Sequence, residues 1–316
     1  MSISKEKIVE NLVELLNEDQ VVTDEVVLKE SSIDRYRKYE QCHEVYTQPI
    51  PSAVVFAKST EDIQKIITFA NKNRINIVPR TGHSAIEGGL ETSLENSIVL
   101  DGSMMNKIIE INETNMQVTC QCGVPLEELE NKLRDLGYTT GHSPQSKPLA
   151  QMGGLVATRS IGQFSTLYGG IEDMIVGLEA VFPEGNICRI KNVPRRSVGP
   201  DIRHIVLGNE GALCYITEVT VKIFKYQPEN NLFLGYKIKD MDKGFSALRK
   251  VMVEGYKPSV ARLYDTQDAA MNFDWSDGEN VLIFMAEGPE KISQVTAKEI
   301  DKIVKSIDGV TPVDSS

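Results

Sequence analysis

The sequence lacks the features by which several common classes of protein are recognised. It has no run of about 18 apolar residues, so no transmembrane span is expected. No G-x-G-x-x-G follows an expected strand and no G-x-x-x-x-G-K-S/T is present, which argues against a nicotinamide Rossmann site and a nucleoside triphosphate site. The N-terminus has apolar residues at helical spacing with acids between them, a pattern typical of an amphipathic helix and not of a secretory signal.

An excess of basic residues is also missing. The chain has 34 Lys and Arg against 45 Asp and Glu, with a formal net charge of -11. Nucleic acid or an anionic membrane would require a concentrated basic face, so neither is expected as the main partner. The 316 residues are 41% apolar and 25% charged, which predicts a globular protein.

The cysteines do not form a metal-binding or disulfide pattern. Their number is odd and no C-x-x-C spacing occurs, so we expect no metal site, reduced thiols and a cytoplasmic location. The five are Cys42, Cys120, Cys122, Cys188 and Cys214. The four histidines, at positions 43, 83, 142 and 204, are scattered along the chain.

The pattern of helices and strands divides the chain into three parts. Residues 1–44 form an N-terminal helical segment, residues 45–226 an α+β domain, and residues 227–316 a second, smaller domain. In the α+β domain, a strand at 53–56, a helix capped by Ser59 and a strand at 75–78 form a β-α-β unit. Further strands are expected at 98–100, 116–122, 174–182 and 187–190, and a helix opens at Pro125.

The second domain has the order β-α-β-β-α. Strands are expected at 232–238, 259–264 and 280–286, with helices at 243–254 and 290–307. A ferredoxin-like sandwich needs one more strand, and residues 309–313 are the only candidate, so we expect a partial ferredoxin-like domain.

Two glycine-rich blocks carry candidate binding chemistry. The first runs from Pro79 to Ala85 directly after a strand and leads to Gly88-Gly89-Leu90, so its backbone amides can surround a pyrophosphate. The second covers residues 141–162 and 168–173, where Gly, Ser, Thr and Gln can line a slot for a flat polar ring. An ordinary glycine turn and a plain surface loop are the alternatives.

The third block covers residues 195–223. Gly199-Pro200-Asp201 predicts a turn with Asp201 as helix N-cap, followed by Ile202, Ile205 and Val206 at helical spacing. Arg203 and His204 are then solvated helix residues. Gly208 and Gly211 enclose Asn209-Glu210, where amides can approach a ligand, and residues 216–223 alternate like a half-buried strand.

The three blocks, in this order, resemble the PCMH-type flavin-binding domain of the vanillyl-alcohol oxidase superfamily. The closest branch holds alkylglycerone-phosphate synthase and the D-lactate and glycolate dehydrogenases. The resemblance implies a two-subdomain FAD-binding domain of α+β class, followed by a substrate-binding cap. By position it assigns these residues to FAD: Pro79, Arg80, Thr81, Gly82, His83, Ser84, Ala85, Gln145, Ser146, Gln151, Gly153, Gly154, Thr158, Arg159, Ser160, Ile161, Gly162, Glu210, Gly211, Ala212 and Ile216.

Four residues in these blocks depart from the family pattern: Thr81 and His83 replace two family glycines, and Ala212 and Cys214 replace a family Thr and Gly. Some members tether FAD through a histidine of the first loop, but His83 is one position away from the usual attachment site, so we expect non-covalent FAD. Cys214 replaces a family glycine, and we interpret it as a small buried thiol without a redox role.

The resemblance implies flavin-dependent redox chemistry on a small hydroxy acid or related alcohol, or a redox-neutral carbon-oxygen exchange on an acyl-glycerone phosphate. In the family, a histidine-rich motif near the C-terminus carries substrate-side acids and bases. Nothing here matches that motif, so a truncated chain is expected and no catalytic residue is assigned. A non-catalytic flavin-binding module or fragment is the alternative. A homodimer and a missing C-terminal half both stay open.

Overall fold

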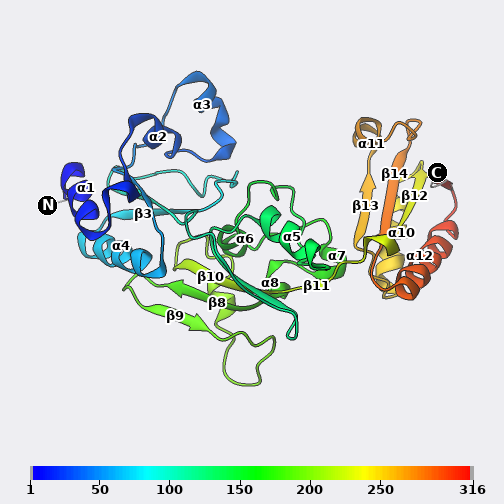
Figure 1. Cartoon of the computed structure of the whole chain (residues 1–316). Coiled ribbons are helices and arrows are strands. Elements are labelled where there is room, and N and C mark those ends of the chain that lie inside the picture. The colour runs from blue at the N-terminus through cyan, green and yellow to red at the C-terminus, as the bar shows by residue number, and fades with distance from the viewer. Residues whose placement is uncertain (1–2, 314–316) are drawn as a thin grey trace. The chain divides into compact units, whose positions relative to one another are not determined.

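The computed structural model describes residues 3–313 and divides the chain into two compact units (Figure 1). The first unit consists of Met1–Leu133, Pro144–Ser160 and Ile171–Ile223. The second consists of Arg134–Ser143, Ile161–Gly170 and Phe224–Ser316. Two short pieces from the middle of the chain therefore belong to the second unit, an arrangement that the order of elements in the sequence does not reveal.

The first unit begins with a helical segment and a four-stranded sheet. The helical elements are α1 (Lys5–Leu15), η1 (Glu18–Gln20), α2 (Glu25–Glu30), η2 (Arg35–Arg37) and α3 (Lys38–His43). The sheet has the order β1 (Val21–Val22), β2 (Val54–Phe56), β4 (Ser97–Asp101) and β3 (Asn76–Arg80). Strands β2 and β3 are both parallel to β4, which lies between them. The strands of the predicted β-α-β unit are therefore separated by one strand.

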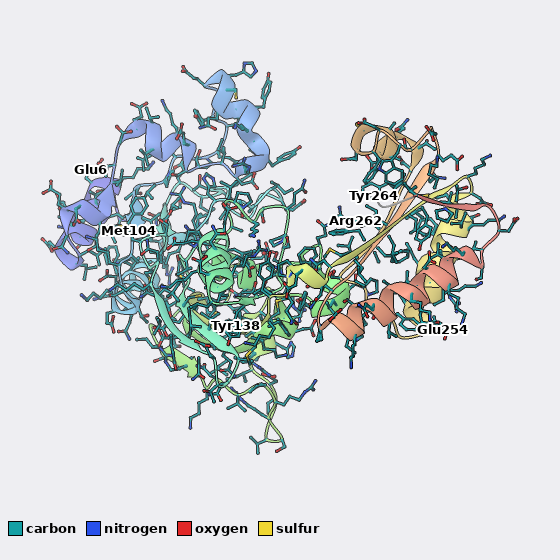
Figure 2. The ribbon with its side chains drawn as sticks, turned by 45° about the vertical axis from the view of Figure 1, so that its right-hand side comes forward. Glu6, Met104, Tyr138, Glu254, Arg262 and Tyr264 are labelled. Carbon is teal, nitrogen blue, oxygen red and sulfur yellow. The ribbon has the colours of Figure 1, made fainter. Side chains whose placement is uncertain are left out.

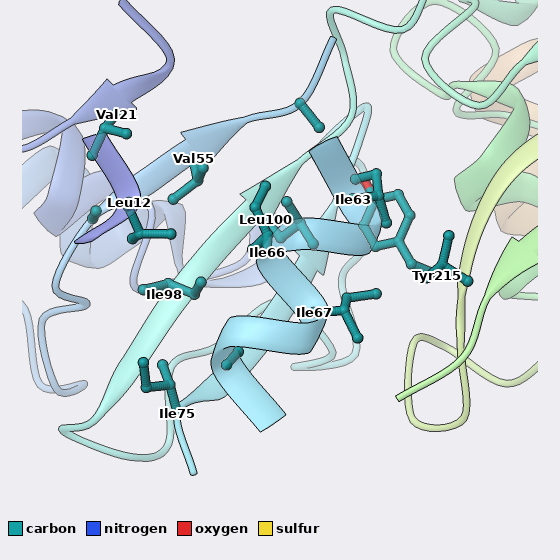
Figure 3. Close-up of a cluster of buried hydrophobic side chains, with 14 of the residues drawn as sticks. Leu12, Val21, Val55, Ile63, Ile66, Ile67, Ile75, Ile98, Leu100 and Tyr215 are labelled. Atoms are coloured by element: carbon teal, nitrogen blue, oxygen red, sulfur yellow. The ribbon is translucent and has the colours of Figure 1, made fainter. Parts of the chain in front are cut away.

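Helix α4 (Thr60–Asn73) covers this sheet because its apolar side chains recur on one face. Its N-terminus is capped by Ser59, whose hydroxyl accepts the Asp62 amide at 3.1 Å, as the sequence predicts. Ile63 and Ile66 are fully buried and pack with Leu100 and other aliphatic residues (Figure 3). The helix thereby fixes the sheet whose strand β3 ends at the first glycine-rich block.

A five-stranded antiparallel sheet completes the core of the first unit. Its order is β5 (Ile108–Asn112), β6 (Gln117–Gln121), β10 (Tyr215–Lys222), β8 (Ile175–Val181) and β9 (Ile187–Ile190). The remaining helices are α5 (Leu126–Asp135), which extends into the second unit, α6 (Met152–Ala157), α8 (Ile171–Met174) and α9 (Arg203–Val206).

The strand predicted at residues 216–223 is formed as β10, but the prediction that it is half-buried is wrong. Strand β10 lies in the middle of its sheet, and nearly all of its residues are buried. Its polar positions are satisfied inside the protein: the Thr217 hydroxyl donates to Glu179 at 2.9 Å, and Thr220 shares a hydrogen bond with Thr119. Thr217 and Thr220 therefore do not indicate a solvent face here, because buried hydroxyls find partners on neighbouring strands.

The second unit contains a four-stranded antiparallel sheet with the order β13 (Val260–Tyr264), β14 (Asn280–Ala286), β12 (Leu232–Ile238) and β15 (Val310–Val313). Strand β15 pairs with β12, so the candidate fourth strand is formed and the ferredoxin-like β-α-β-β-α-β order is complete. The other elements are β7 (Tyr138–Thr139), α7 (Ser165–Tyr168), β11 (Phe224–Lys225), η3 (Pro228–Asn230), α10 (Met241–Val253), α11 (Thr266–Asn272) and α12 (Glu290–Lys305).

Helices α10 and α12 bury one face of this sheet. Tyr236 and Phe284 lie in that core with their ring centroids 6.5 Å apart. Arg262 and Tyr264 alternate with the core positions of β13 and lie close together (Figure 2), with the guanidinium donating to the Tyr264 hydroxyl at 3.1 Å. Helix α11, capped by Asp265, is not predicted from the sequence.

None of the helices in the described part of the chain is long and apolar enough to cross a membrane.

Candidate cofactor site

A cavity of about 350 Å³ lies in the first unit, within the size range of small-molecule sites. Three segments that are far apart in the sequence line it: the loop after β3, the segment around α6, and the turn that leads into β10. These are the three blocks selected from the sequence. Predicted residues in the lining are Pro79, Arg80, Thr81, Gly82, His83, Ser84, Ala85, Ser146, Gln151, Gly153, Gly154, Thr158, Ser160, Glu210, Gly211 and Ile216.

The backbone amides of residues 81–85 are available to a ligand. None of the five has a hydrogen-bond acceptor among residues 3–313, although these residues line the cavity. The carbonyls at both ends of the loop are held by the protein: Arg80 O accepts the Tyr215 hydroxyl at 2.8 Å, and Ala85 O accepts the Arg35 amide at 3.1 Å. Consecutive unpaired amides form the concave arrangement that binds phosphate oxygens.

Gly82 brings this loop against the second segment. A β-carbon at this position would lie 2.3 Å from the carbonyl oxygen of Leu149 and 2.9 Å from the amide nitrogen of Gln151. Both neighbours are backbone atoms, so they cannot rotate away as a side chain would. Only glycine allows the two segments to approach this closely, and Gly82 and Gln151 both line the cavity.

The second segment offers an unpaired acceptor. Oxygen Oε1 of Gln151 is buried and has no hydrogen-bond partner in the described part of the chain, although Gln151 lines the cavity. A buried amide oxygen without a partner is costly unless a ligand supplies a donor. Unpaired donors in the loop and an unpaired acceptor at Gln151 fit a ligand that carries phosphates and a ring N–H group.

The third segment contradicts the expectation of open amides at residues 209 and 210. The Asn209 amide donates to Val206 O at 3.4 Å and the Glu210 amide to Ala157 O at 3.0 Å. The Gly211 amide donates to Oδ1 of Asn209 at 2.9 Å. The same Asn209 oxygen also accepts from Leu213 and Cys214. The side chain of Asn209 therefore accepts the amides that the turn would otherwise offer to a ligand. Gly211 is required for packing, because a β-carbon would lie 1.9 Å from Cγ of Pro79.

The helix that precedes this turn also differs from the prediction. Helix α9 is a single turn, and Ile202 and Ile205 are exposed while Val206 is buried. The N-cap of α9 is Ile202, so the prediction of Asp201 as N-cap is wrong. The Asp201 carboxylate instead accepts the Arg203 amide at 3.1 Å and also binds the Arg203 guanidinium. Arg203 is buried, and its Nη1 donates to Ile175 O at 3.0 Å, so the interpretation as a solvated residue is wrong.

Charges beside the cavity are neutralised inside the protein. The Arg80 guanidinium pairs with the buried Asp101 carboxylate at 2.7 Å and therefore holds the start of the first loop. Burial, followed by the nearby charge of Arg80, lowers the pKa of His83. Burial raises the pKa of the Cys214 thiol to about 11, so this residue is a neutral thiol near pH 7.

Some predicted residues lie elsewhere, and some lining residues are not predicted. Gln145, Arg159 and Ala212 are outside the lining, while Ile161 and Gly162 belong to the second unit. Lining residues not assigned to the cofactor from the sequence are Ile86, Glu87, Gly89, Leu90, Leu155, Ala157, Cys214 and Tyr215. Gly89 and Leu90 are part of the motif that follows the first loop, so that motif was the available signal.

Comparison with known proteins defines the class. Residues 51–191 match the FAD binding domain family. The chain therefore carries an FAD-binding domain with a PCMH-type fold, and its cofactor is FAD. The open amides of the first loop and the unpaired oxygen of Gln151 fit this cofactor.

Particular relatives give the degree of similarity. The chain is 64% identical over 316 residues to YgcU of Escherichia coli (strain K12), named as an uncharacterized FAD-linked oxidoreductase; the match covers the whole chain and 65% of that protein. Alkyldihydroxyacetonephosphate synthase of Caenorhabditis elegans is 36% identical over 225 residues, covering 70% of this chain and 38% of that protein. The chain thus spans less than two thirds of the length of these relatives.

Solved structures confirm the fold. An alkyldihydroxyacetonephosphate synthase superposes with a TM-score of 0.88 at 24% identity, covering 100% of this chain and 61% of that one. A p-cresol methylhydroxylase superposes with a TM-score of 0.78 at 18% identity, covering 98% of this chain and 65% of that one.

Proposed function

We propose that the protein is an FAD-dependent oxidoreductase that acts on a small hydroxy acid or a related alcohol. The observation that supports this function most directly is the row of unpaired backbone amides at residues 81–85. These residues line the cavity and lie in the part of the chain that matches the FAD binding domain family. Relatives include a D-lactate dehydrogenase of Saccharomyces cerevisiae, 31% identical over 222 residues. The proposal includes a cytoplasmic location, supported by cysteines that are all free thiols in the structure.

Bound FAD would supply the capacity to accept electrons from the substrate. The chain's own residues would bind and orient it. In this proposal the amides of residues 81–85 donate to the phosphates, and Gln151 accepts from a ring N–H. Gly82 allows the loop and the second segment to close on the cofactor, which excludes water from one side. The single hydrogen bond from His83 to a protein carbonyl supports non-covalent attachment.

A second candidate is a redox-neutral carbon-oxygen exchange on an acyl-glycerone phosphate. It is favoured by the 36% identity to alkyldihydroxyacetonephosphate synthase over 225 residues. The two candidates share the FAD site and differ in whether the substrate delivers electrons that leave the protein.

Anaerobic titration with candidate substrates tests the proposal. The purified chain is saturated with FAD, separated from free cofactor, and mixed with D-lactate, with glycolate, or with an acyl-glycerone phosphate together with a long-chain alcohol. Loss of the visible flavin band with a hydroxy acid is the expected result. Exchange of the acyl group for an alcohol, without net flavin reduction, would select the second candidate. A protein that binds FAD but responds to none of these substrates would contradict both.

A further inference from the structure

Hydrogen bonds join the first loop to a short stretch of the N-terminal segment. Residues 31–35, here called the strap, lie outside the part of the chain that matches the FAD binding domain family. Four hydrogen bonds join the strap to residues 80–88: Arg80 Nη1 to Ser31 Oγ at 2.9 Å, the His83 ring to Ile33 O at 3.1 Å, the Arg35 amide to Ala85 O at 3.1 Å, and the Gly88 amide to the Asp34 carboxylate.

His83 occupies an unfavourable backbone conformation within this loop. Its φ is 49°, in the left-handed region that residues with a β-carbon rarely adopt. The ring nitrogen Nε2 donates to Ile33 O, and burial lowers the pKa of the ring, which favours the neutral form with its proton on Nε2. The ring hydrogen bond therefore opposes relaxation of the backbone at the centre of the row of open amides.

Asp34 makes the corresponding contact at the far end of the loop. Its carboxylate is buried, with 2% of the residue's surface exposed, and accepts the amides of Tyr36 and Gly88. A buried carboxylate that binds two amides fixes the position of both chain segments. A second cavity of about 280 Å³ adjoins the strap, and both Arg80 and His83 line it as well as the first cavity. These two side chains thus form part of the wall between the cavities.

We propose that His83 and Asp34 are positioning residues for the cofactor, which hold the amides of residues 81–85 open for phosphate. This inference rests on the proposed FAD site. Neither side chain needs to touch the cofactor: His83 acts through Ile33 O, and Asp34 acts through the Gly88 amide. The strap is therefore part of the FAD site, although it precedes the family's matched region.

A matched pair of variants tests the role of His83. Gln and Met have similar length and share the same strain at a left-handed position, but only the Gln amide can donate to Ile33 O. We expect His83→Met to weaken FAD binding about tenfold, the value of roughly one buried hydrogen bond, and His83→Gln to stay within about threefold of wild type. Binding is measured by quenching of FAD fluorescence, independently of any substrate.

Further variants keep the result interpretable. His83→Gly relieves the backbone strain without supplying a donor, and should also bind FAD about tenfold more weakly. Asp34→Ala should weaken binding in the same direction. His43→Met, at an exposed position on α3, is the control and should bind as wild type does.

The outcomes separate the two proposals. Equal FAD affinity of the Gln and Met variants, or wild-type affinity of His83→Gly, would overturn the positioning role while leaving the FAD site intact. Absence of FAD binding by the wild-type chain would overturn the FAD site itself. If the Met variant does not fold, as judged by circular dichroism, the comparison of wild type, Gln and Gly decides the question.

Discussion

The loop after β3 and the turn before β10 line the same cavity and both are rich in small residues, yet they use their backbone amides in opposite ways. In the first, the amides of residues 81–85 have no acceptor within the described chain, and the carbonyls of Arg80 and Ala85 and the His83 ring are hydrogen-bonded to other segments of the protein. In the turn before β10, the backbone amides donate to the side chain of Asn209 and to the carbonyl of Ala157.

The difference shows that glycine content alone does not identify an anion-binding loop. Gly82 and Gly211 both allow a close backbone approach, and a β-carbon at either would overlap a neighbour. What distinguishes the loops is whether the protein supplies internal acceptors. A turn whose backbone amides donate to its own Asn side chain has a structural role. A loop whose carbonyls are hydrogen-bonded to other segments, and whose amides have no acceptor in the protein, can donate those amides to a ligand.

The largest effect is expected from Gly82→Ala. Its β-carbon would meet two backbone atoms, so the loop must move away from the second segment and the cavity would lose its shape. We expect FAD affinity to fall at least about 100-fold, measured by fluorescence quenching. Gly235→Ala is the matched control, because its nearest neighbour would lie at an ordinary 3.6 Å. Similar FAD affinity in both variants would show that the loop contact is not required.

Asn209→Ala should act on stability more than on cofactor affinity. The change removes the acceptor of three amides, at Gly211, Leu213 and Cys214, in a buried turn. We expect the free energy of unfolding of the apoprotein to fall by about 3 kcal/mol, measured in urea. FAD affinity of the remaining folded protein should fall less than in Gly82→Ala. A large affinity loss without a stability loss would reverse the roles assigned to the two loops.

The first loop should also make stability depend on pH through His83. Its folded pKa is lowered from the ordinary value of 6.5, mainly by burial, so the unfolded chain binds the proton more readily. Stability is therefore lost as the pH falls through the unfolded pKa. His83→Gln should lose less stability than wild type between about pH 7 and pH 5.5, measured by thermal unfolding without FAD. An unchanged pH dependence would place the titrating group elsewhere.

The smallest effect concerns the Cys214 thiol in the turn before β10. Because burial raises its pKa to about 11, it should resist alkylation in the native protein while the exposed Cys42 reacts. Asn209→Ala should accelerate the labelling of Cys214, since that turn would open more often. Mass spectrometry of labelled peptides measures both. Rapid labelling of Cys214 in the wild-type protein would contradict the conclusion that the turn before β10 is closed by its internal hydrogen bonds.

Much of the fold follows from local patterns. Strand β14 has the predicted bounds of residues 280–286, and Ser59 caps α4 as expected, because alternation and capping are local signals. Helix α11 and the burial of β10 were missed. Those features depend on contacts between distant segments, such as the hydrogen bond between Thr217 and Glu179, which no local pattern shows.

The segments that line the candidate site could be predicted from the sequence, but the strap that holds the first loop could not. The first loop follows a strand and contains Gly82 and small hydroxyl residues, so its position was evident. The strap was not, because its contacts include the carbonyl of Ile33, and a backbone carbonyl has no sequence signature. Asn209 carried an available signal, since Asn before small residues often accepts nearby amides in a turn.

Hydrogen exchange of the backbone amides tests the difference between the two loops most directly. Peptides covering residues 81–85 and 209–214 are compared by mass spectrometry with and without saturating FAD. The open amides of residues 81–85 should exchange rapidly in the apoprotein and become protected when FAD binds, while residues 209–214 should be protected in both states. Unchanged exchange at residues 81–85 on FAD binding, or new protection confined to residues 209–214, would contradict the account.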